Sequence, residues 1–563
     1  MTQGSKERTG ARAVIETFQA EGVELIFGYP GGAVLPLYAE LARTSIRHIL
    51  VRQEQNAVHA ASGYARISGK TGVCLATSGP GATNLVTGIA AAYMDSVPVV
   101  IFTGQVPTRM VGSDAFQETD ITGITIPITK HNYLVKDVEE LPRIAKEAFY
   151  IASTGRPGPV LVDIPKDVAL APCRAPLPER VELRGYKPTY QGHPGQLRAL
   201  ARLLGEAERP LIFAGGGVLA SRAEDYLRQL VEKLQVPVVT SLTGLGAFPE
   251  DNPLALGMVG LHGKPCANHA LMECDLLVGL GVRFDDRVTG ALEKFAPRAR
   301  IAHLDIDPAE IGKNVRVDLP LVGDISCILQ ELLPLVEPAS HPSWLQRIKE
   351  LRNLYPLTYG RGGEVRPQWV MERLGEMTRG QAIIVTDVGQ HQMWAALFYG
   401  YTEPRSFVSS CGLGTMGYGL PAAVGVALAR RDKQVWLITG DGSFQMSMAE
   451  MGTAMEQGLP LKILLFNNQS LAMVRQLQHF YYDRQYTAVE FTANPDFVRL
   501  AECYGAEGLR ITKQEEVVPV LARAMGNDRL TLIECIISPE EMVYPMVPEG
   551  AGLDEMLLPE NVG

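Results

Sequence analysis

The sequence predicts an α/β protein of three domains, each a mostly parallel sheet flanked by helices, with a Rossmann-like middle domain. Its length of 563 residues suits three or four domains, at roughly 150 residues each. Short apolar runs that end in glycine or a polar residue alternate with amphipathic stretches of about 10 to 15 residues, as in βαβ units. Two proline-dense intervals, 172–194 and 334–367, divide this alternation into three blocks.

Each block contains apolar runs of the length and composition of buried strands. The first domain is expected over residues 1–175, with strands at 25–28, 47–52, 72–77 and 98–103. The second is expected over 190–340, with strands at 211–214, 236–240, 275–280 and 301–305. The third is expected over 365–540, with strands at 382–386, 434–439 and 461–466. Residues 541–563 contain too much proline for a regular element, so we expect an extended arm.

Composition and charge exclude several classes of function. The net charge is −10 and no run of lysine and arginine stands out, which argues against nucleic-acid binding and a polybasic membrane patch. The chain has no apolar stretch of 18 or more residues, and its polar first ten residues give no sign of a signal peptide. Eight scattered cysteines without a C-x-x-C pair indicate reduced thiols. We therefore expect a cytoplasmic protein with small-molecule partners.

The most informative motif is Gly440-Asp441-Gly442, which Asn468 follows 27 positions after Asp441. One helix, expected over 447–457, and one strand lie between them, so the two side chains should meet at the carboxyl ends of neighbouring parallel strands. Mg²⁺ prefers such oxygen ligands and commonly shares them with phosphate. Asp441, Asn468 and the Ser470 carbonyl are the predicted ligands, with Gly442 and Ser443 facing a diphosphate. An isolated Gly-Asp-Gly is more often a surface turn, but the spacing favours the metal site.

With this motif the sequence resembles thiamine diphosphate enzymes of the pyruvate-decarboxylating group. The resemblance implies that Glu54, after the strand at 47–52, hydrogen-bonds the aminopyrimidine of the cofactor and promotes its activation. It also implies that Met416 bends the cofactor and that the Gly414 carbonyl holds the pyrimidine amino group, although methionine is a frequent core filler. The other expected cofactor contacts are Gly389, Gln390, His391 and Met473.

Six further stretches narrow the resemblance to the catalytic large subunit of acetohydroxyacid synthase, also called acetolactate synthase. They are residues 28–33, 112–118, 130–133, 283–290, 387–394 and 543–548, in the order of the family. The implied reaction decarboxylates pyruvate and joins the hydroxyethyl unit to a second 2-ketoacid, giving 2-acetolactate from pyruvate or 2-aceto-2-hydroxybutyrate from 2-ketobutyrate. This is the first common step of branched-chain amino acid biosynthesis.

The same resemblance assigns residues to the substrate. Arg287 is expected to bind the carboxylate of the second 2-ketoacid, since a guanidinium pairs bidentately with a carboxylate. The alternative for Arg287 is a surface ion pair with Asp285 or Asp286. The rest of the substrate pocket is expected from Phe116, Gln117, Lys166 and the turn at 31–33.

The middle domain resembles a domain that binds FAD as a structural cofactor. Glycines allow close approach to a pyrophosphate, and a carboxylate at a strand end suits a ribose hydroxyl. The expected FAD contacts are Gly215, Gly216, Gly217, Leu242, His262, Arg283 and Asp305. A second glycine pattern, G-x-G-x-x-G at 412–417, follows only a short apolar segment and lacks an acid about 20 residues later. It is therefore not interpreted as a dinucleotide site.

Two positions depart from the family. Leu477 stands where family members usually carry a tryptophan that favours 2-ketobutyrate and anchors sulfonylurea herbicides. We expect a weaker preference for the larger acceptor and tolerance of these herbicides. Ala472 replaces a glycine near the cofactor, and no consequence follows from its sequence context.

The resemblance also implies a homodimer, or a dimer of dimers, with cofactors at the interface, and a possible separate regulatory small subunit. Three alternatives stay open from the sequence: a flavin-dependent pyruvate oxidase, a catabolic acetolactate synthase without FAD, and a silent binding or regulatory relative. Oxygen consumption, the absence of yellow colour and the absence of acetolactate formation, respectively, would identify them.

Overall fold

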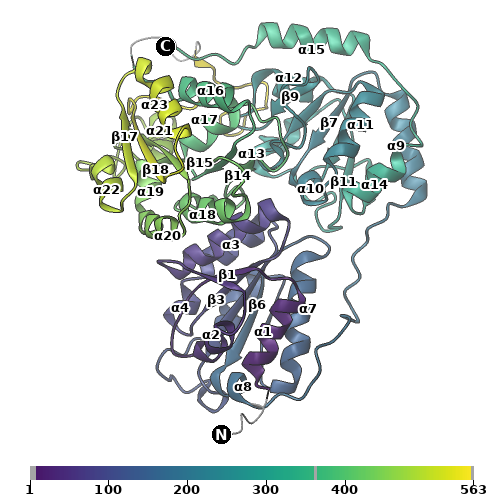
Figure 1. Cartoon of the computed structure of the whole chain (residues 1–563). Helices are drawn as coiled ribbons and strands as arrows, with labels where there is room; N and C mark the ends of the chain where they lie inside the picture. Colours follow the sequence, from purple (N-terminus) through teal and green to yellow (C-terminus); the bar gives the residue numbers. More distant parts are fainter. Residues whose placement is uncertain (1–7, 361–363, 560–563) are drawn as a thin grey trace.

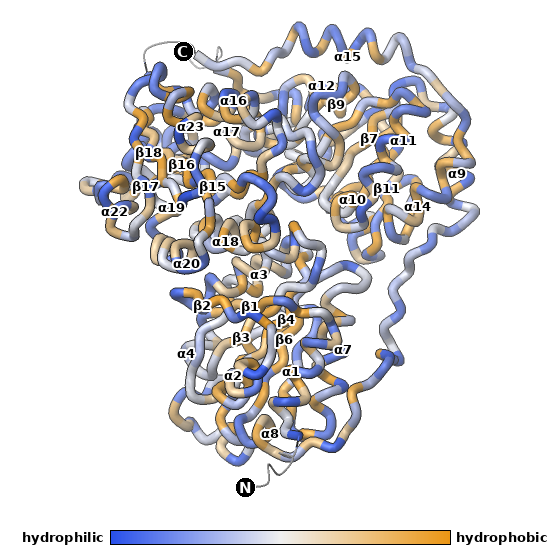
Figure 2. The backbone as a smooth tube through the Cα atoms, viewed as in Figure 1, coloured by the Kyte–Doolittle hydropathy of each residue, from blue (hydrophilic) through white to orange (hydrophobic). Residues whose placement is uncertain are grey.

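The structure, a computed structural model, describes residues 8–360 and 364–559 and confirms three α/β domains (Figure 1). Each domain contains a six-stranded sheet in which every paired strand is parallel. Apolar residues concentrate on the strands, as buried parallel strands require (Figure 2). No helix in the described part of the chain is long and apolar enough to cross a membrane.

The first domain has the strand order β2-β1-β3-β4-β6-β5. Its strands are β1 Leu25–Tyr29, β2 Arg47–Leu50, β3 Gly72–Ala76, β4 Val99–Gln105, β5 His131–Leu134 and β6 Val160–Pro165. Its helices are α1 Gly10–Ala20, α2 Leu35–Leu41, α3 Glu54–Ser68, α4 Pro80–Thr83, α5 Val86–Met94, α6 Ile121–Thr125, α7 Leu141–Ser153 and α8 Lys166–Leu170. Strands β5 and β6 were not predicted; β6 contains Asp163 and ends in Pro165, which hides its strand pattern.

The middle domain has the order β12-β11-β10-β7-β8-β9. Its strands are β7 Pro210–Ala214, β8 Val238–Thr240, β9 Ala255–Met258, β10 Leu276–Leu280, β11 Arg300–Asp305 and β12 Leu319–Val322. Its helices are α9 Pro194–Glu206, α10 Gly216–Ala220, α11 Glu224–Leu234, α12 Pro265–Glu273, α13 Asp286–Thr289, α14 Ile325–Leu332 and α15 Pro342–Leu354. The connector between α8 and α9 runs along the outside of the molecule (Figure 1).

The third domain has the order β14-β13-β15-β16-β18-β17. Its strands are β13 Ile383–Thr386, β14 Phe407–Val408, β15 Val435–Gly440, β16 Lys462–Asn467, β17 Glu507–Ile511 and β18 Thr531–Ile536. Its helices are α16 Pro367–Thr378, α17 Gln390–Phe398, α18 Gly419–Ala429, α19 Asp441–Gln445, α20 Met451–Glu456, α21 Ala472–Tyr481, α22 Phe497–Cys503 and α23 Val517–Met525.

One expected helix is divided in the structure. The helix predicted over 447–457 is a 3-10 turn, Met448–Glu450, followed by α20, and a separate helix, α19, begins directly at Asp441. The side chain of Glu450 explains the break, since it turns to the first domain and accepts hydrogen bonds from Arg52 N at 2.6 Å and Asn56 Nδ2 at 3.0 Å.

Helices α3 and α18 join the first domain to the third through very close backbone contact. A Cβ placed on Gly63 would lie 2.2 Å from the carbonyl oxygen of Ala422, and one on Gly425 would lie 1.9 Å from that of Ala60. Only glycine permits this approach. The core formed around these helices extends through both sheets, so the two domains share one hydrophobic core.

The segment after β18 forms an arm without a helix or strand through residue 559, the last one described. It crosses from the third domain to the middle domain. Gln476 on α21 accepts a hydrogen bond from Val543 N at 2.9 Å, and Leu261 O accepts one from Val547 N at 2.8 Å.

Candidate functional site

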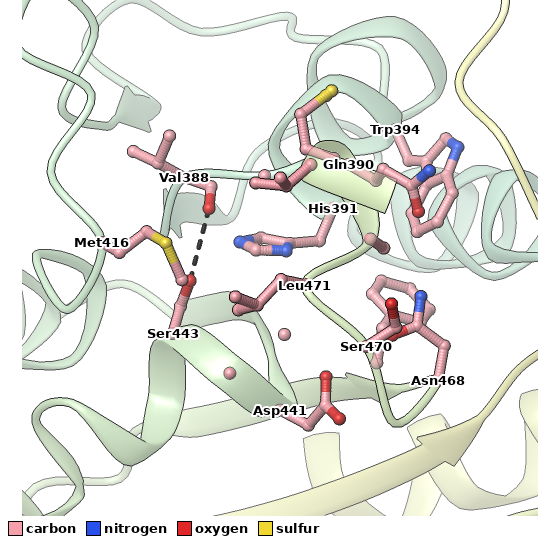
Figure 3. A pocket seen from close by; sticks show the side chains of 17 residues that line it. Val388, Gln390, His391, Trp394, Met416, Asp441, Ser443, Asn468, Ser470 and Leu471 are labelled. Atoms are coloured by element: carbon pink, nitrogen blue, oxygen red, sulfur yellow. Dashed lines mark hydrogen bonds between the residues drawn. The ribbon is translucent and has the colours of Figure 1, made fainter. Parts of the chain in front are cut away.

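A pocket lies at the carboxyl ends of three adjacent strands, β13, β15 and β16. Ligands of open α/β sheets bind at this edge. The pocket is lined by Val388, Gly389, Gln390, His391, Trp394, Met416, Gly440, Asp441, Gly442, Ser443, Phe466, Asn468, Ser470, Leu471, Ala472, Met473 and Val474. Segments that are distant in the sequence therefore converge on one site (Figure 3).

Asp441, Asn468 and Ser470, the predicted metal ligands, all line this pocket. Figure 3 shows the Asp441 carboxylate directed toward the side where Asn468 and Ser470 lie. Burial raises the pKa of Asp441 to about 6, although a hydrogen bond from Asn494 acts in the opposite direction. Among the described residues, no group of three or more histidine, cysteine and acidic side chains is arranged to hold a metal ion. The predicted set at this pocket instead combines one carboxylate with amide and carbonyl oxygens, which suit Mg²⁺.

Polar atoms on the opposite wall of the pocket are buried without partners. Gln390 Oε1, His391 Nε2 and Trp394 Nε1 have no hydrogen-bond partner within the described chain. Burial lowers the pKa of His391 to about 3, so its imidazole is neutral at physiological pH and can donate or accept one bond. Buried polar groups are normally satisfied, so these atoms fit a polar ligand such as a diphosphate-bearing cofactor.

Met416 reaches the pocket from a loop between β14 and α18. Gly414 in this loop has a left-handed φ of 70°, which glycine adopts without strain. Gly417 N and Gly419 N donate to Asp387 Oδ1 at 2.8 and 3.2 Å. Asp387, in the third domain, thereby holds the end of the loop next to Met416. Burial raises the pKa of its carboxyl group to about 6.

A single chain does not bring Glu54 to this pocket. Glu54 begins α3, accepts a hydrogen bond of 2.9 Å from Asn84 Nδ2, and is absent from the described lining. The loop that carries Met416 meets the first domain near Arg66, at the other end of α3. Twelve residues separate Glu54 from Arg66, which corresponds to about 18 Å along the helix axis.

The predicted substrate residues also lie outside the described pocket lining. Phe116 is 87% exposed, and Gln117 follows it with a left-handed φ of 59°. Lys166 opens α8 and is half-buried. The Arg287 side chain is 77% exposed and forms an ion pair with Asp286 at 3.5 Å, which is the alternative that the sequence left open.

The predicted flavin residues surround the carboxyl ends of β7, β8, β10 and β11. Gly215 and Gly217 pack directly on the backbone of Gly281, which follows β10. Asp305 is buried at the end of β11, and burial raises its pKa to about 6. Thr240 Oγ1, at the end of β8, is buried without a partner in the described chain, which fits a polar ligand.

The other predicted flavin residues are partly engaged elsewhere. His262 Nδ1 lies 2.8 Å from Pro545 O, so this ring contacts the arm. Arg283 donates to Met94 O at 2.6 Å and to Asp285 Oδ2 at 3.0 Å. Gly216 begins α10, and Leu242 begins a 3-10 turn after β8.

Ala472 and Leu477, the two positions that depart from the family, lie on different parts of α21. Ala472 and Met473, at its start, line the pocket, whereas Leu477 is 42% exposed and lies outside the lining.

Asn494 and Trp394 are site residues that the sequence reasoning missed. Asn494 contacts Asp441 from a loop whose Asn-Pro pair indicates only a turn. Trp394 lies one turn after Gln390 on α17, so the start of that helix could have identified it.

Comparison with known proteins shows the family to which the chain belongs. Residues 8–124, 197–332 and 387–535 match the N-terminal TPP binding, central and C-terminal TPP binding domains of thiamine pyrophosphate enzymes. A probable acetolactate synthase large subunit of Methanocaldococcus jannaschii is 50% identical over 98% of this chain and 96% of its own length. The acetolactate synthase large subunit of Haemophilus influenzae is 46% identical over 98% of both chains. The acetolactate synthase of Mycobacterium leprae is 49% identical over 98% of this chain and 90% of its own.

Proposed function

Because the chain belongs to the acetolactate synthase large subunits of the thiamine diphosphate enzymes, we propose that it decarboxylates pyruvate and transfers the remaining two-carbon unit to a second 2-ketoacid. Two pyruvates give 2-acetolactate, and 2-ketobutyrate as acceptor gives 2-aceto-2-hydroxybutyrate. The reaction is the first common step of branched-chain amino acid biosynthesis. The observation that carries this proposal is the pocket at the ends of β13, β15 and β16, which combines oxygen ligands with unpartnered polar atoms.

Thiamine diphosphate, when bound, would supply a nucleophilic carbon for the carbonyl of pyruvate and a thiazolium ring that can take up the electron pair left when CO₂ departs. We assign Asp441, Asn468 and the Ser470 carbonyl to a Mg²⁺ ion, since all three line one pocket. Gly389, Gln390, His391, Gly442 and Ser443 face the same space and are assigned to the diphosphate.

The ring end of the cofactor is assigned to Met416 and Gly414 on one chain and to Glu54 on a second copy. The separation of about 18 Å along α3 supports two chains, since Glu54 and the Met416 loop meet opposite ends of that helix. In a symmetric dimer each chain would complete the site of the other. Gln117, Lys166 and Arg287, which lie outside the pocket of one chain, are assigned to the substrate at this junction.

The direct test is product analysis with pyruvate alone and with 2-ketobutyrate added, in the presence of thiamine diphosphate and Mg²⁺. We expect acetolactate in the first reaction and both products in the second. Oxygen consumption with bleaching of a bound flavin would instead identify a pyruvate oxidase. Failure to form either product under any condition would refute the proposed reaction.

Mixing two inactive variants tests the two-chain site. Glu54→Gln removes the acid and Asp441→Ala removes a metal ligand, so each variant alone should be inactive. A hybrid dimer would contain one intact site and one doubly altered site, so co-expression should restore up to about a quarter of the wild-type activity. A site built within one chain would give no restoration.

We further propose that the middle domain binds FAD as a structural group. The close packing of Gly215 and Gly217, the unpartnered Thr240 hydroxyl and the buried Asp305 support a polar ligand there. Flavin absorbance in the purified protein, and its loss in Gly215→Val, would test this. A colourless, fully active enzyme would favour the catabolic type.

We also propose that the protein is cytoplasmic and that it associates with a regulatory small subunit. The unpaired thiols support a reducing compartment. Copurification of a small partner with the tagged chain from its native cells would test the association, and its absence under gentle lysis would argue against it.

A further inference from the structure

All three domains meet at the turn that ends α5. The helix ends at Met94, and Asp95 forms its C-cap. A carboxylate is unfavourable at the negative end of a helix dipole, and the next residue, Ser96, has a left-handed φ of 56°. Local structure therefore does not favour aspartate here, and the compensating contacts must come from other parts of the chain.

The Asp95 carboxylate receives three hydrogen bonds, two of them from the third domain. Gly412 N donates to Oδ1 at 2.7 Å, and Cys411 N donates to Oδ2 at 3.0 Å. Arg66 Nη2 on α3 also donates to Oδ2, at 2.6 Å, and the Asp95 side chain is only 1% exposed. Charge-assisted bonds of this kind are short and directional, so the backbone at 411–412 is held in one position.

Gly412 packs tightly against the end of α5. A Cβ on Gly412 would lie 3.0 Å from Met94 Cβ and 3.1 Å from Asp95 Oδ1, closer than about nine in ten real contacts. A side chain at residue 412 would therefore displace the loop or the end of α5 by a few tenths of an ångström.

The same loop carries Met416 into the cofactor pocket. Asp387 holds its far end through Gly417 N and Gly419 N, and Asp95 holds its near end. Two carboxylates from two domains therefore fix both ends of the segment that contains Gly414 and Met416.

The middle domain contacts the same turn. Arg283 donates to Met94 O at 2.6 Å, which satisfies a carbonyl in the last turn of α5. The turn at 94–95 is thus joined to the middle domain through its backbone and to the third domain through its side chain.

We propose that Asp95 is a positioning residue of the reaction: it holds Cys411 and Gly412 so that Met416 keeps the geometry needed to support the bent cofactor. The inference rests on the proposed function, since Met416 acts on a cofactor only there. Asp95 itself does not line the pocket as described, so its effect passes through the loop.

The test uses the full chain with Asp95→Asn. The amide retains one acceptor oxygen but directs a donor toward other donors, so the loop should lose a hydrogen bond. We expect kcat to fall about tenfold or more while the KM for pyruvate changes little, because displacement of a catalytic segment by about 1 Å costs up to a hundredfold. The near-UV circular dichroism of bound thiamine diphosphate should also change.

The matched control is Glu147→Gln, which removes a buried contact with Arg143 on α7, 2.7 Å long; its other hydrogen-bond partner, Tyr133, also lies in the first domain. We expect this control to lose thermal stability without a change in kcat or in the cofactor spectrum. If Asp95→Asn behaves like the control, or like the wild type, the positioning role is refuted.

A second variant covers the case in which Asp95→Asn does not fold. Gly412→Ala keeps the carboxylate but places a methyl group against Met94, so it should give the same loss of kcat and spectral change. Wild-type kcat in a folded Gly412→Ala protein would overturn the proposal.

Hydrogen exchange separates this inference from the proposed reaction. Amides 411 and 412 should exchange faster in Asp95→Asn than in Glu147→Gln, with or without added cofactor. A wild-type protein that makes no acetolactate would refute the reaction, yet exchange and cofactor binding would still test the loop contact. Unchanged exchange at 411–412 would refute the contact even in an active enzyme.

Discussion

The side-chain amide of Asn494 donates a 2.6 Å hydrogen bond to Oδ2 of Asp441. Asn494 also donates to Asn467 Oδ1 at 3.2 Å and accepts from Gln445 at 3.2 Å, so its own orientation is fixed. Asn494→Ala should weaken Mg²⁺ binding about 10- to 100-fold, since partners that orient a metal ligand contribute that much. Calorimetric titration with Mg²⁺ and thiamine diphosphate would measure this. Asn252→Ala, which removes only a local loop contact, should bind Mg²⁺ as the wild type does.

Glu54→Gln should leave the fold intact and reduce acetolactate formation severely. The amide retains the size of the side chain but cannot supply the carboxyl that promotes cofactor activation. Initial rates and thermal melting of the purified variant would test this. Glu456→Gln, which alters a half-exposed partner of Arg52 nearby, is the control and should remain active. Turnover of Glu54→Gln within twofold of the control would contradict the role of Glu54.

Leu477→Trp should raise the preference for 2-ketobutyrate and restore sensitivity to sulfonylurea herbicides. Leu477 is accessible on α21, so an indole can be accommodated there without displacing core side chains. A competition assay with both acceptors, together with inhibitor titration, would compare wild type and variant. Strong preference for 2-ketobutyrate or nanomolar inhibition in the unaltered chain would contradict this prediction.

Asp163 should make stability depend on pH. Burial raises its pKa to about 7, although Thr103 and Gln105 donate hydrogen bonds to it. The folded state therefore retains a proton that the unfolded chain releases near pH 4. The free energy of unfolding should fall as the pH rises from about 4 to about 7, by up to about 1.4 kcal/mol per pH unit. Melting temperatures from pH 5 to 8 would show the wild type declining relative to Asp163→Asn up to about pH 7. Parallel profiles would contradict this.

The strand pattern was sufficient to locate much of the site. Glycine and polar residues after the apolar runs at 434–439 and 461–466 indicated that Asp441 and Asn468 would meet, and the structure places both on one pocket. The parallel architecture was also predicted correctly, because buried parallel strands are continuous apolar runs.

Contacts made across the fold could not be predicted in the same way. β14 has only two residues, so no periodicity identifies it. Asn494 and Asp95 act through partners distant in the sequence, and their local patterns indicate only turns. Glu450 breaks the expected helix because its partners, Arg52 and Asn56, belong to another domain.

The packing of Gly63 against Ala422 and of Gly425 against Ala60 leaves no room for a methyl group between the first and third domains. Exchange of the first domain for that of a distant homologue would succeed only if both glycines were retained together. Covariation at this crossing should consequently be strict, whereas the long connector between α8 and α9 should tolerate more variation in length and sequence, as surface connections generally do. Chimeras and circular permutants of this enzyme are best designed with their junctions in that connector.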